Sequence, residues 1–256
     1  MTIYSLQGKR GLVVGIANEH SIAYGCATAF RDMGAELAVT YLNQKAEPYV
    51  RPLAEKLGAG MTMPCDLRQP GELEAVIDAI RERWGRLDFL LHSVAFAPRE
   101  DLHARVVDCS AEGFALAMDV SCHSFIRMTK LAEPLMTGGG CLMTVTFFGA
   151  EKVVEHYNMM GPVKAALESS VRYMAAELGG KGIRVHALSP GAMATRAASG
   201  IDRFDELLAR TAERAPTHHL VTVEDIGPCA AFLASDAARQ LTGLTLYIDG
   251  GYHIVG

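Results

Sequence analysis

Seven short apolar runs, separated by longer amphipathic stretches, constrain the fold of this chain more than any other feature. Most of the runs are continuous rather than alternating, which is typical of parallel strands covered on both faces. The predicted strands are 11–15, 36–41, 61–66, 87–93, 141–146, 183–190 and 244–251. The predicted helices are 21–33, 71–84, 112–136, 161–179 and 224–234. This order predicts an α/β protein with a doubly wound, seven-stranded parallel sheet and helices on both faces.

The chain shows no linker, low-complexity tract or internal repeat, and 256 residues suffice for one large α/β domain. We therefore predict a single domain over residues 1–256. Segment 192–215 follows the sixth predicted strand without a strand pattern of its own. Folds of this type place a substrate-covering element at that position, so we expect a helical covering segment there.

Composition and charge exclude several kinds of partner. Half of the residues are hydrophobic and 21% are charged, as in a soluble globular protein, and the net charge of −5 favours neither nucleic acid nor an anionic membrane. No apolar run approaches the roughly 20 residues that span a bilayer, and the N-terminus lacks a signal-peptide core, so we expect a cytoplasmic protein. The six cysteines include no C-x-x-C pair, and His218–His219 have no further ligand at a recognisable spacing, so we expect no metal.

The first strand runs directly into the motif "GIANEHSIAYG", which suits a nucleotide. Gly15 allows a sharp turn, Ser21 can cap the following helix, and Gly25 permits close packing of that helix on the sheet. Free amides at the helix start would face an anion such as a pyrophosphate. The motif is not a regular G-x-G-x-x-G, and an ordinary capped helix after a glycine turn fits it equally well.

The ends of the next strands favour the dinucleotide reading, since ligands gather at the carboxyl ends of strands in open α/β sheets. Asp66 could accept a hydrogen bond from an adenine amino group, or it could simply cap a turn. The second strand ends in Thr40-Tyr41-Leu42-Asn43, with neither an acidic residue for a ribose hydroxyl nor an adjacent arginine for a 2′-phosphate. Lys45 is the only cation nearby. We therefore expect NADH, with NADPH open.

Tyr157 and Lys164 form a candidate catalytic pair directly after the fifth strand. Their spacing of seven is close to two helical turns, so both can point to one side if the chain keeps its direction. An ammonium near a phenol favours the phenolate, and such a pair could deliver a proton. Asn158 can cap the helix that follows, and Pro162 is tolerable only within its first turn. A core tyrosine and a surface lysine are the alternative, which the position after a strand of a nucleotide fold disfavours.

At these residues the chain resembles the divergent short-chain dehydrogenases typified by NADH-dependent enoyl-acyl-carrier-protein reductase. The resemblance spans nearly the whole chain and includes "GIANEHSIAYG", "LDFLLHSVAFAP", "YNMMGPVKAALESSVRYMAAELG", "GIRVHALSPG", "AASGI" and "DGGY". Ordinary members use Y-x3-K, a position that Met160 occupies here, whereas this branch uses Y-x6-K. The resemblance implies a Rossmann-like fold, a homotetramer, and reduction of the 2,3 double bond of a trans-2-enoyl thioester in fatty-acid synthesis.

The resemblance also implies roles for individual residues. Tyr157 would stabilise the enolate through the thioester carbonyl, and Lys164 would bind the nicotinamide ribose. The implied cofactor-binding residues are Gly15, Ser21, Ile22, Asp66, Leu67, Val94, Lys164, Met193 and Thr195. The implied substrate-binding residues are Ala97, Phe147, Tyr157, Met160 and Phe204.

The chain departs from the family pattern at three places. Phe147 stands where relatives usually carry a second tyrosine, Ala95 replaces a glycine near the nicotinamide, and an acidic run, 202–206, replaces basic side chains that suit an acidic carrier protein. These departures leave two alternatives open. The first is a related reductase of enoyl-CoA or a specialised acyl chain, and the second is a cofactor-binding paralogue with impaired turnover.

Overall fold

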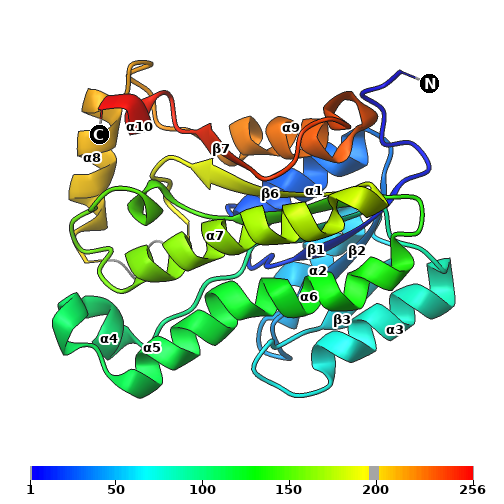
Figure 1. Cartoon of the computed structure of the whole chain (residues 1–256), viewed down its shortest axis with the longest axis horizontal. Helices are drawn as coiled ribbons and strands as arrows, with labels where there is room; N and C mark the ends of the chain where they lie inside the picture. The colour runs from blue at the N-terminus through cyan, green and yellow to red at the C-terminus, as the bar shows by residue number, and fades with distance from the viewer. Residues whose placement is uncertain (1, 196–201, 256) are drawn as a thin grey trace.

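The seven predicted strands all form, and they pair in the order β3-β2-β1-β4-β5-β6-β7 in one parallel sheet (Figure 1). The computed structural model describes residues 2–195 and 202–255. Its strands are β1 (Arg10–Val14), β2 (Glu36–Tyr41), β3 (Met61–Pro64), β4 (Phe89–His92), β5 (Gly140–Val145), β6 (Ile183–Pro190) and β7 (Leu244–Ile248). The predicted α/β class and parallel topology are confirmed.

Helices connect the strands, and several differ from the prediction. The α-helices are α1 (Ile22–Asp32), α2 (Glu47–Lys56), α3 (Glu72–Trp84), α4 (Arg99–His103), α5 (Ala111–Met118), α6 (Ser124–Ala132), α7 (Met160–Leu178), α8 (Phe204–Arg214), α9 (Val223–Ala234) and α10 (Tyr252–Val255). Short 3₁₀ helices are η1 (Val106–Asp108), η3 (Glu133–Leu135), η4 (Phe148–Ala150), η5 (Gly179–Lys181) and η7 (Asp236–Ala238). The segment 112–136, predicted as one helix, is helical without a break to Leu135: α5 is followed by a π-helical turn, η2 (Asp119–His123), and then by α6 and η3.

The helices form two layers, one on each face of the sheet (Figure 1). Successive strand residues point to opposite faces, so Leu12 and Leu90 pack with α3, α6 and α7 while Val13 and Leu91 pack with α1, α2 and α9. All four side chains are fully buried. Burying one leucine contributes about 1.5–3 kcal/mol, so both faces of the sheet favour folding. The continuous apolar runs of the sequence follow from this double coverage.

Helices α1 and α9 touch backbone to backbone. A Cβ added at Gly25 would lie 2.5 Å from the carbonyl oxygen of Val223, and one added at Gly227 would lie 2.5 Å from that of Gly25. Since no side chain tolerates such an approach, glycine is required on both helices. Gly25 was predicted to allow close packing on the sheet, and that prediction is wrong because its neighbour is α9.

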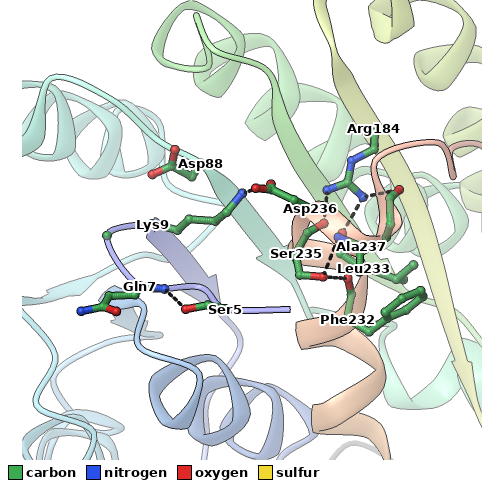
Figure 2. Close-up of polar contacts among 12 residues, drawn as sticks. Ser5, Gln7, Lys9, Asp88, Arg184, Phe232, Leu233, Ser235, Asp236 and Ala237 are labelled. Carbon is green, nitrogen blue, oxygen red and sulfur yellow. Dashed lines mark hydrogen bonds and ion pairs between the residues drawn. The ribbon is translucent and has the colours of Figure 1, made fainter. Parts of the chain in front are cut away.

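Polar side chains hold the amino-terminal edge of the sheet together (Figure 2). Arg184, on β6, donates hydrogen bonds to the carbonyl groups of Leu233 and Ser235 at the end of α9. Lys9, just before β1, forms an ion pair with Asp236 at 2.6 Å. These contacts lie at the edge opposite the carboxyl ends of the strands. Ligands of open α/β sheets bind at the carboxyl ends, so a ligand site is expected at that other edge.

The described residues include no helix long and apolar enough to cross a membrane. Helix α8 lies within the segment 192–215 that was predicted to cover the substrate. The motif at 197–201, which carries part of the family resemblance, lies outside the described residues.

Candidate active site

A cavity of about 170 Å³ opens among the segments that follow β4, β5 and β6. Nine residues that were predicted to bind cofactor or substrate line it: Ile22, Ala97, Phe147, Tyr157, Met160, Lys164, Met193, Thr195 and Phe204. The other lining residues are Ala95, Phe96, Leu102, Val145, Thr146, Pro190, Gly191 and Ala192. In the described parts of the chain no three His, Cys, Asp or Glu side chains gather in a way that could hold a metal.

Tyr157 and Lys164 reach this cavity together, although they do not share one helix. Helix α7 begins at Met160, so Tyr157 belongs to the turn before it. The residues on either side of the tyrosine, His156 and Asn158, have left-handed backbone conformations with φ of 64° and 45°. The two side chains thus reach the same cavity, as the spacing of seven indicated. The turn before α7, and not helical periodicity, places the phenol.

Tyr157 is 8% exposed and held by aromatic and backbone contacts. Its ring meets that of Phe147 edge-on, with 4.9 Å between centroids, and lies directly against Gly149. Burial, and then the charge of Glu168, raise the pKa of Tyr157. The prediction that a nearby ammonium favours the phenolate is wrong in this structure because burial dominates. At neutral pH Tyr157 is a phenol and can donate a hydrogen bond.

Lys164 is 4% exposed, and its ammonium group donates a hydrogen bond to the carbonyl oxygen of Val145 at 2.8 Å. Burial lowers the pKa of Lys164 to about 8, and the nearby Cys122 and Glu168 oppose that shift only in part. Glu168 lies one turn further along α7 and accepts a hydrogen bond from Thr146 at 2.7 Å. The lysine is therefore a cation at neutral pH that changes its charge within the physiological range.

The amino-terminal end of α1 has the geometry of an anion site. The hydroxyl oxygen of Ser21 accepts hydrogen bonds from the amides of Ala17 and Asn18, both at 3.0 Å, and makes no capping bond to α1. The predicted helix cap is therefore wrong. The first amides of α1 that have an acceptor within the helix are those of Tyr24 and Gly25, which both donate to the carbonyl oxygen of Ser21. The amides of Ile22 and Ala23 come before them and have no acceptor within the helix. A pyrophosphate fits this uncapped end.

The turn after β1 passes against the end of β4. Gly15 has a φ of 115°, and a Cβ there would lie 2.1 Å from the carbonyl oxygen of Ser93. Val94 follows Ser93 directly, so the two predicted cofactor residues Gly15 and Val94 lie at adjacent strand ends. A side chain at Gly15 would fill the space between these two strand ends. The Gly15 turn and the amino-terminal end of α1 together fit the backbone of a dinucleotide.

Asp66 and Leu67 follow β3 and do not line the cavity. The carboxylate of Asp66 accepts hydrogen bonds from the Arg68 guanidinium at 2.9 and 2.7 Å, which lower the pKa of Asp66. Leu67 is buried in the core. Arg68 in turn stacks on the ring of Phe96, 5.5 Å from its centroid, and Phe96 does line the cavity. Asp66 and Leu67 therefore lie outside the cavity lining, and Asp66 is linked to the lining through Arg68 and Phe96.

Sequence reasoning missed one contact beside the cavity. The side-chain amide of Asn158 donates a hydrogen bond to the carbonyl oxygen of Leu102, on α4, at 2.8 Å. Asn158 was predicted to cap α7, and that is wrong because Met159 is the residue before the helix. Pro162 does lie in the first turn of α7, as predicted. The missed bond joins positions 56 residues apart, and no local pattern signals it.

Comparisons with known proteins agree with this geometry. The family model described as "Enoyl-(Acyl carrier protein) reductase" matches residues 15–253. The chain is 44% identical to enoyl-[acyl-carrier-protein] reductase [NADH] 1 of Rhizobium meliloti, over 98% of this chain and 92% of that protein. It is 45% identical to enoyl-[acyl-carrier-protein] reductase [NADH] FabI of Aquifex aeolicus, over 98% and 93%.

Solved structures of such reductases superpose closely on this one. The Anaplasma phagocytophilum enzyme in complex with NAD has a TM-score of 0.94 and 45% identity, with coverage of 98% of this chain and 96% of that chain. The Bacillus cereus enzyme with NADP+ and indole naphthyridinone has a TM-score of 0.95 and 42% identity, with 98% of each chain covered. The resemblance read from the sequence is thereby confirmed. On the family match and on these near full-length relatives, the chain belongs to the enoyl-acyl-carrier-protein reductase family.

Proposed function

We propose that this protein is an NADH-dependent enoyl-acyl-carrier-protein reductase, which reduces the trans-2 double bond of an enoyl thioester in fatty-acid synthesis. The observation that carries the proposal is the shared apolar cavity of Tyr157 and Lys164 in a chain of this family. A buried phenol and a buried ammonium beside an apolar chamber suit a substrate with one polar carbonyl and a hydrocarbon tail.

NADH would supply the hydride that adds to C3 of the substrate. The uncapped end of α1 and the Gly15 turn would hold its pyrophosphate, with Thr195 close by. Lys164 would hold the nicotinamide ribose with the ammonium donors that Val145 does not use. The remaining residues in this role are Ser21, Ile22, Asp66, Leu67, Val94 and Met193. NADH is preferred over NADPH because the end of β2 carries no arginine.

Tyr157 would donate its phenolic proton in a hydrogen bond to the thioester carbonyl. Negative charge grows on that oxygen as the enolate forms, and C2 is then protonated. A donor aimed at such charge typically contributes about 3–4 kcal/mol to transition-state stabilisation. Because burial keeps Tyr157 protonated, the donor is present at neutral pH. Ala97, Phe147, Met160 and Phe204 would border the acyl chain.

Oxidation of NADH, measured with crotonyl thioesters on acyl carrier protein and on CoA, tests this function. Turnover on carrier protein is expected. Turnover on CoA alone would favour the related enoyl-CoA reductase, a reading that the exposed acidic Asp205 and Glu206 support. NADH binding without turnover would indicate a paralogue impaired by Phe147.

Replacement of the phenol tests the role of Tyr157 within the same assay. Tyr157→Phe is expected to lower kcat by more than a hundredfold, the effect of losing one such donor. Tyr173→Phe, on an exposed tyrosine of α7, is the matched control and should leave kcat unchanged. A near-normal rate for Tyr157→Phe would refute the assigned role.

We further propose a single domain over residues 1–256, in which segment 192–215 covers the substrate. The continuous sheet and the position of Phe204 on the cavity wall support this arrangement. A homotetramer in the cytoplasm is proposed from the family, and six free cysteines suit a reducing compartment. Light scattering and cell fractionation test the two proposals.

A further inference from the structure

We propose that Asn158 is a positioning residue for Tyr157, and that its hydrogen bond to α4 holds the phenol in its reactive place. The proposal rests on the proposed function and deepens it. It starts from a contact beside the cavity, which Tyr157 and Leu102 both line. Asn158 follows the tyrosine and donates a hydrogen bond to the backbone of Leu102, so it ties the tyrosine turn to α4.

The bond has a structural reason on the α4 side. Helix α4 is only five residues long, and the carbonyl groups in the last turn of a helix lack partners within it. Leu102 is the fourth residue of α4, and Asn158 supplies the missing donor at 2.8 Å. The asparagine thus satisfies a carbonyl group at the end of α4 and holds α4 against the tyrosine turn.

The tyrosine turn needs such a tie because its backbone is strained. His156 and Asn158 both have left-handed conformations, which non-glycine residues rarely adopt and which persist only where surrounding contacts enforce them. Asparagine tolerates this region better than most residues. Its backbone therefore accepts the turn while its side chain anchors it. Without the anchor, Tyr157 would keep the ring contacts with Phe147 and Gly149 and the two backbone hydrogen bonds of its own turn.

Helix α4 has a second anchor that does not involve the tyrosine. The carboxylate of Asp101 accepts hydrogen bonds from the backbone amide and the hydroxyl of Ser110, at 2.5 and 3.1 Å. Removing this anchor loosens α4 from the side of α5 and leaves the Asn158 bond in place. Asp101 thus provides a matched control that separates general loosening of α4 from misplacement of Tyr157.

Steady-state kinetics of four proteins tests the proposal: the wild type, Asn158→Gly, Asn158→Asp and Asp101→Ala. Glycine keeps the left-handed backbone without the amide, and aspartate keeps the shape but has no N–H donor at neutral pH. Misplacing a reacting group by 1 Å costs up to about a hundredfold in rate. We expect both Asn158 variants to lower kcat about 10- to 100-fold with KM within threefold, and Asp101→Ala to leave kcat within twofold. An unchanged kcat in Asn158→Gly, or an equal loss in Asp101→Ala, would overturn the proposal.

A spectroscopic readout keeps the test independent of turnover. The protein contains eight tyrosines, which can be labelled with 3-fluorotyrosine. The fluorine resonance missing from Tyr157→Phe identifies position 157. We expect this resonance to shift or broaden in Asn158→Gly but not in Asp101→Ala, and an identical resonance in all three proteins would reject the positioning role. If the wild type does not reduce enoyl thioesters, the proposed function fails while this measurement still decides the role of Asn158.

Discussion

Replacing Gly149 by alanine should displace the Tyr157 ring and lower activity, although the hydroxyl group itself is retained. Gly149 lies in η4, the short helix between β5 and α7, where the tyrosine ring rests on its Cα. A Cβ at this position would lie 2.4 Å from Cδ1 of Tyr157 and 2.9 Å from Cε1. Ordinary contact begins near 3.4 Å, so the ring must retreat by about 1 Å.

The size of this displacement sets the expected losses. A shift of about 1 Å in a group that must meet a substrate carbonyl costs up to about a hundredfold in kcat. Overpacking costs about 1–3 kcal/mol of unfolding free energy. Alanine recovers about 0.4–1 kcal/mol by restricting the unfolded chain. The net destabilisation is about 0–2.6 kcal/mol, which lowers the melting temperature by at most about 10 °C in a chain of this size. Activity should therefore fall far more than stability.

Gly138→Ala is the control for this experiment, because a Cβ at Gly138 would meet nothing within 4 Å. The kcat of both variants is measured with an enoyl thioester and NADH, and the melting temperature by circular dichroism. Gly149→Ala combined with Tyr157→Phe should be no slower than Tyr157→Phe alone, since both changes act on one donor. A Gly149→Ala enzyme with the wild-type kcat would refute the view that this contact places the phenol.

Three further predictions follow from the cavity. Phe147→Tyr keeps the ring contact with Tyr157, so kcat should change less than threefold, and a gain above about a hundredfold would show that an outer hydroxyl matters. Ala95→Gly removes a methyl group from the cavity wall and should tighten flat aromatic inhibitors about tenfold, whereas an unchanged dissociation constant would contradict this. Since burial lowers the pKa of Lys164 to about 8, NADH affinity measured by fluorescence should fall above pH 8. For the same reason Lys164 contributes unfolding free energy that rises between pH 8 and about 10.4, where only the unfolded lysine is protonated, so the wild type should gain stability relative to Lys164→Met over this range.

The strands were predictable because most of the sheet is buried on both faces, so the central strands β1, β4 and β5 are largely uninterrupted apolar runs. Helix α2 was not predicted, since Pro48 and Pro52 both interrupt its pattern, although the structure places Pro48 in its first turn. The π-helical turn at 119–123 escaped prediction because it adds a residue to a continuous helix without changing its composition. Local sequence thus predicts elements better than their irregularities.

For the site, too, some features were predictable from local sequence and others were not. Predicted site residues on the connections after β5 and β6 do line one cavity, because the carboxyl ends of neighbouring strands meet at one edge of the sheet. The caps assigned to Ser21 and Asn158 were wrong, since each side chain had another partner of the right chemistry within reach. The partner of Asn158 is distant in sequence, and only the folded chain determines which acceptor it meets.

The contact between α1 and α9 has a consequence for how the chain is made. The side of α1 that includes Gly25 and Ala29 packs against a helix that comes about 200 residues later. Ribosomes add about 5–20 residues each second, so this face stays uncovered for about 10–40 s of synthesis. An early helix that waits so long for its partner is a natural target for chaperones and a risk for aggregation.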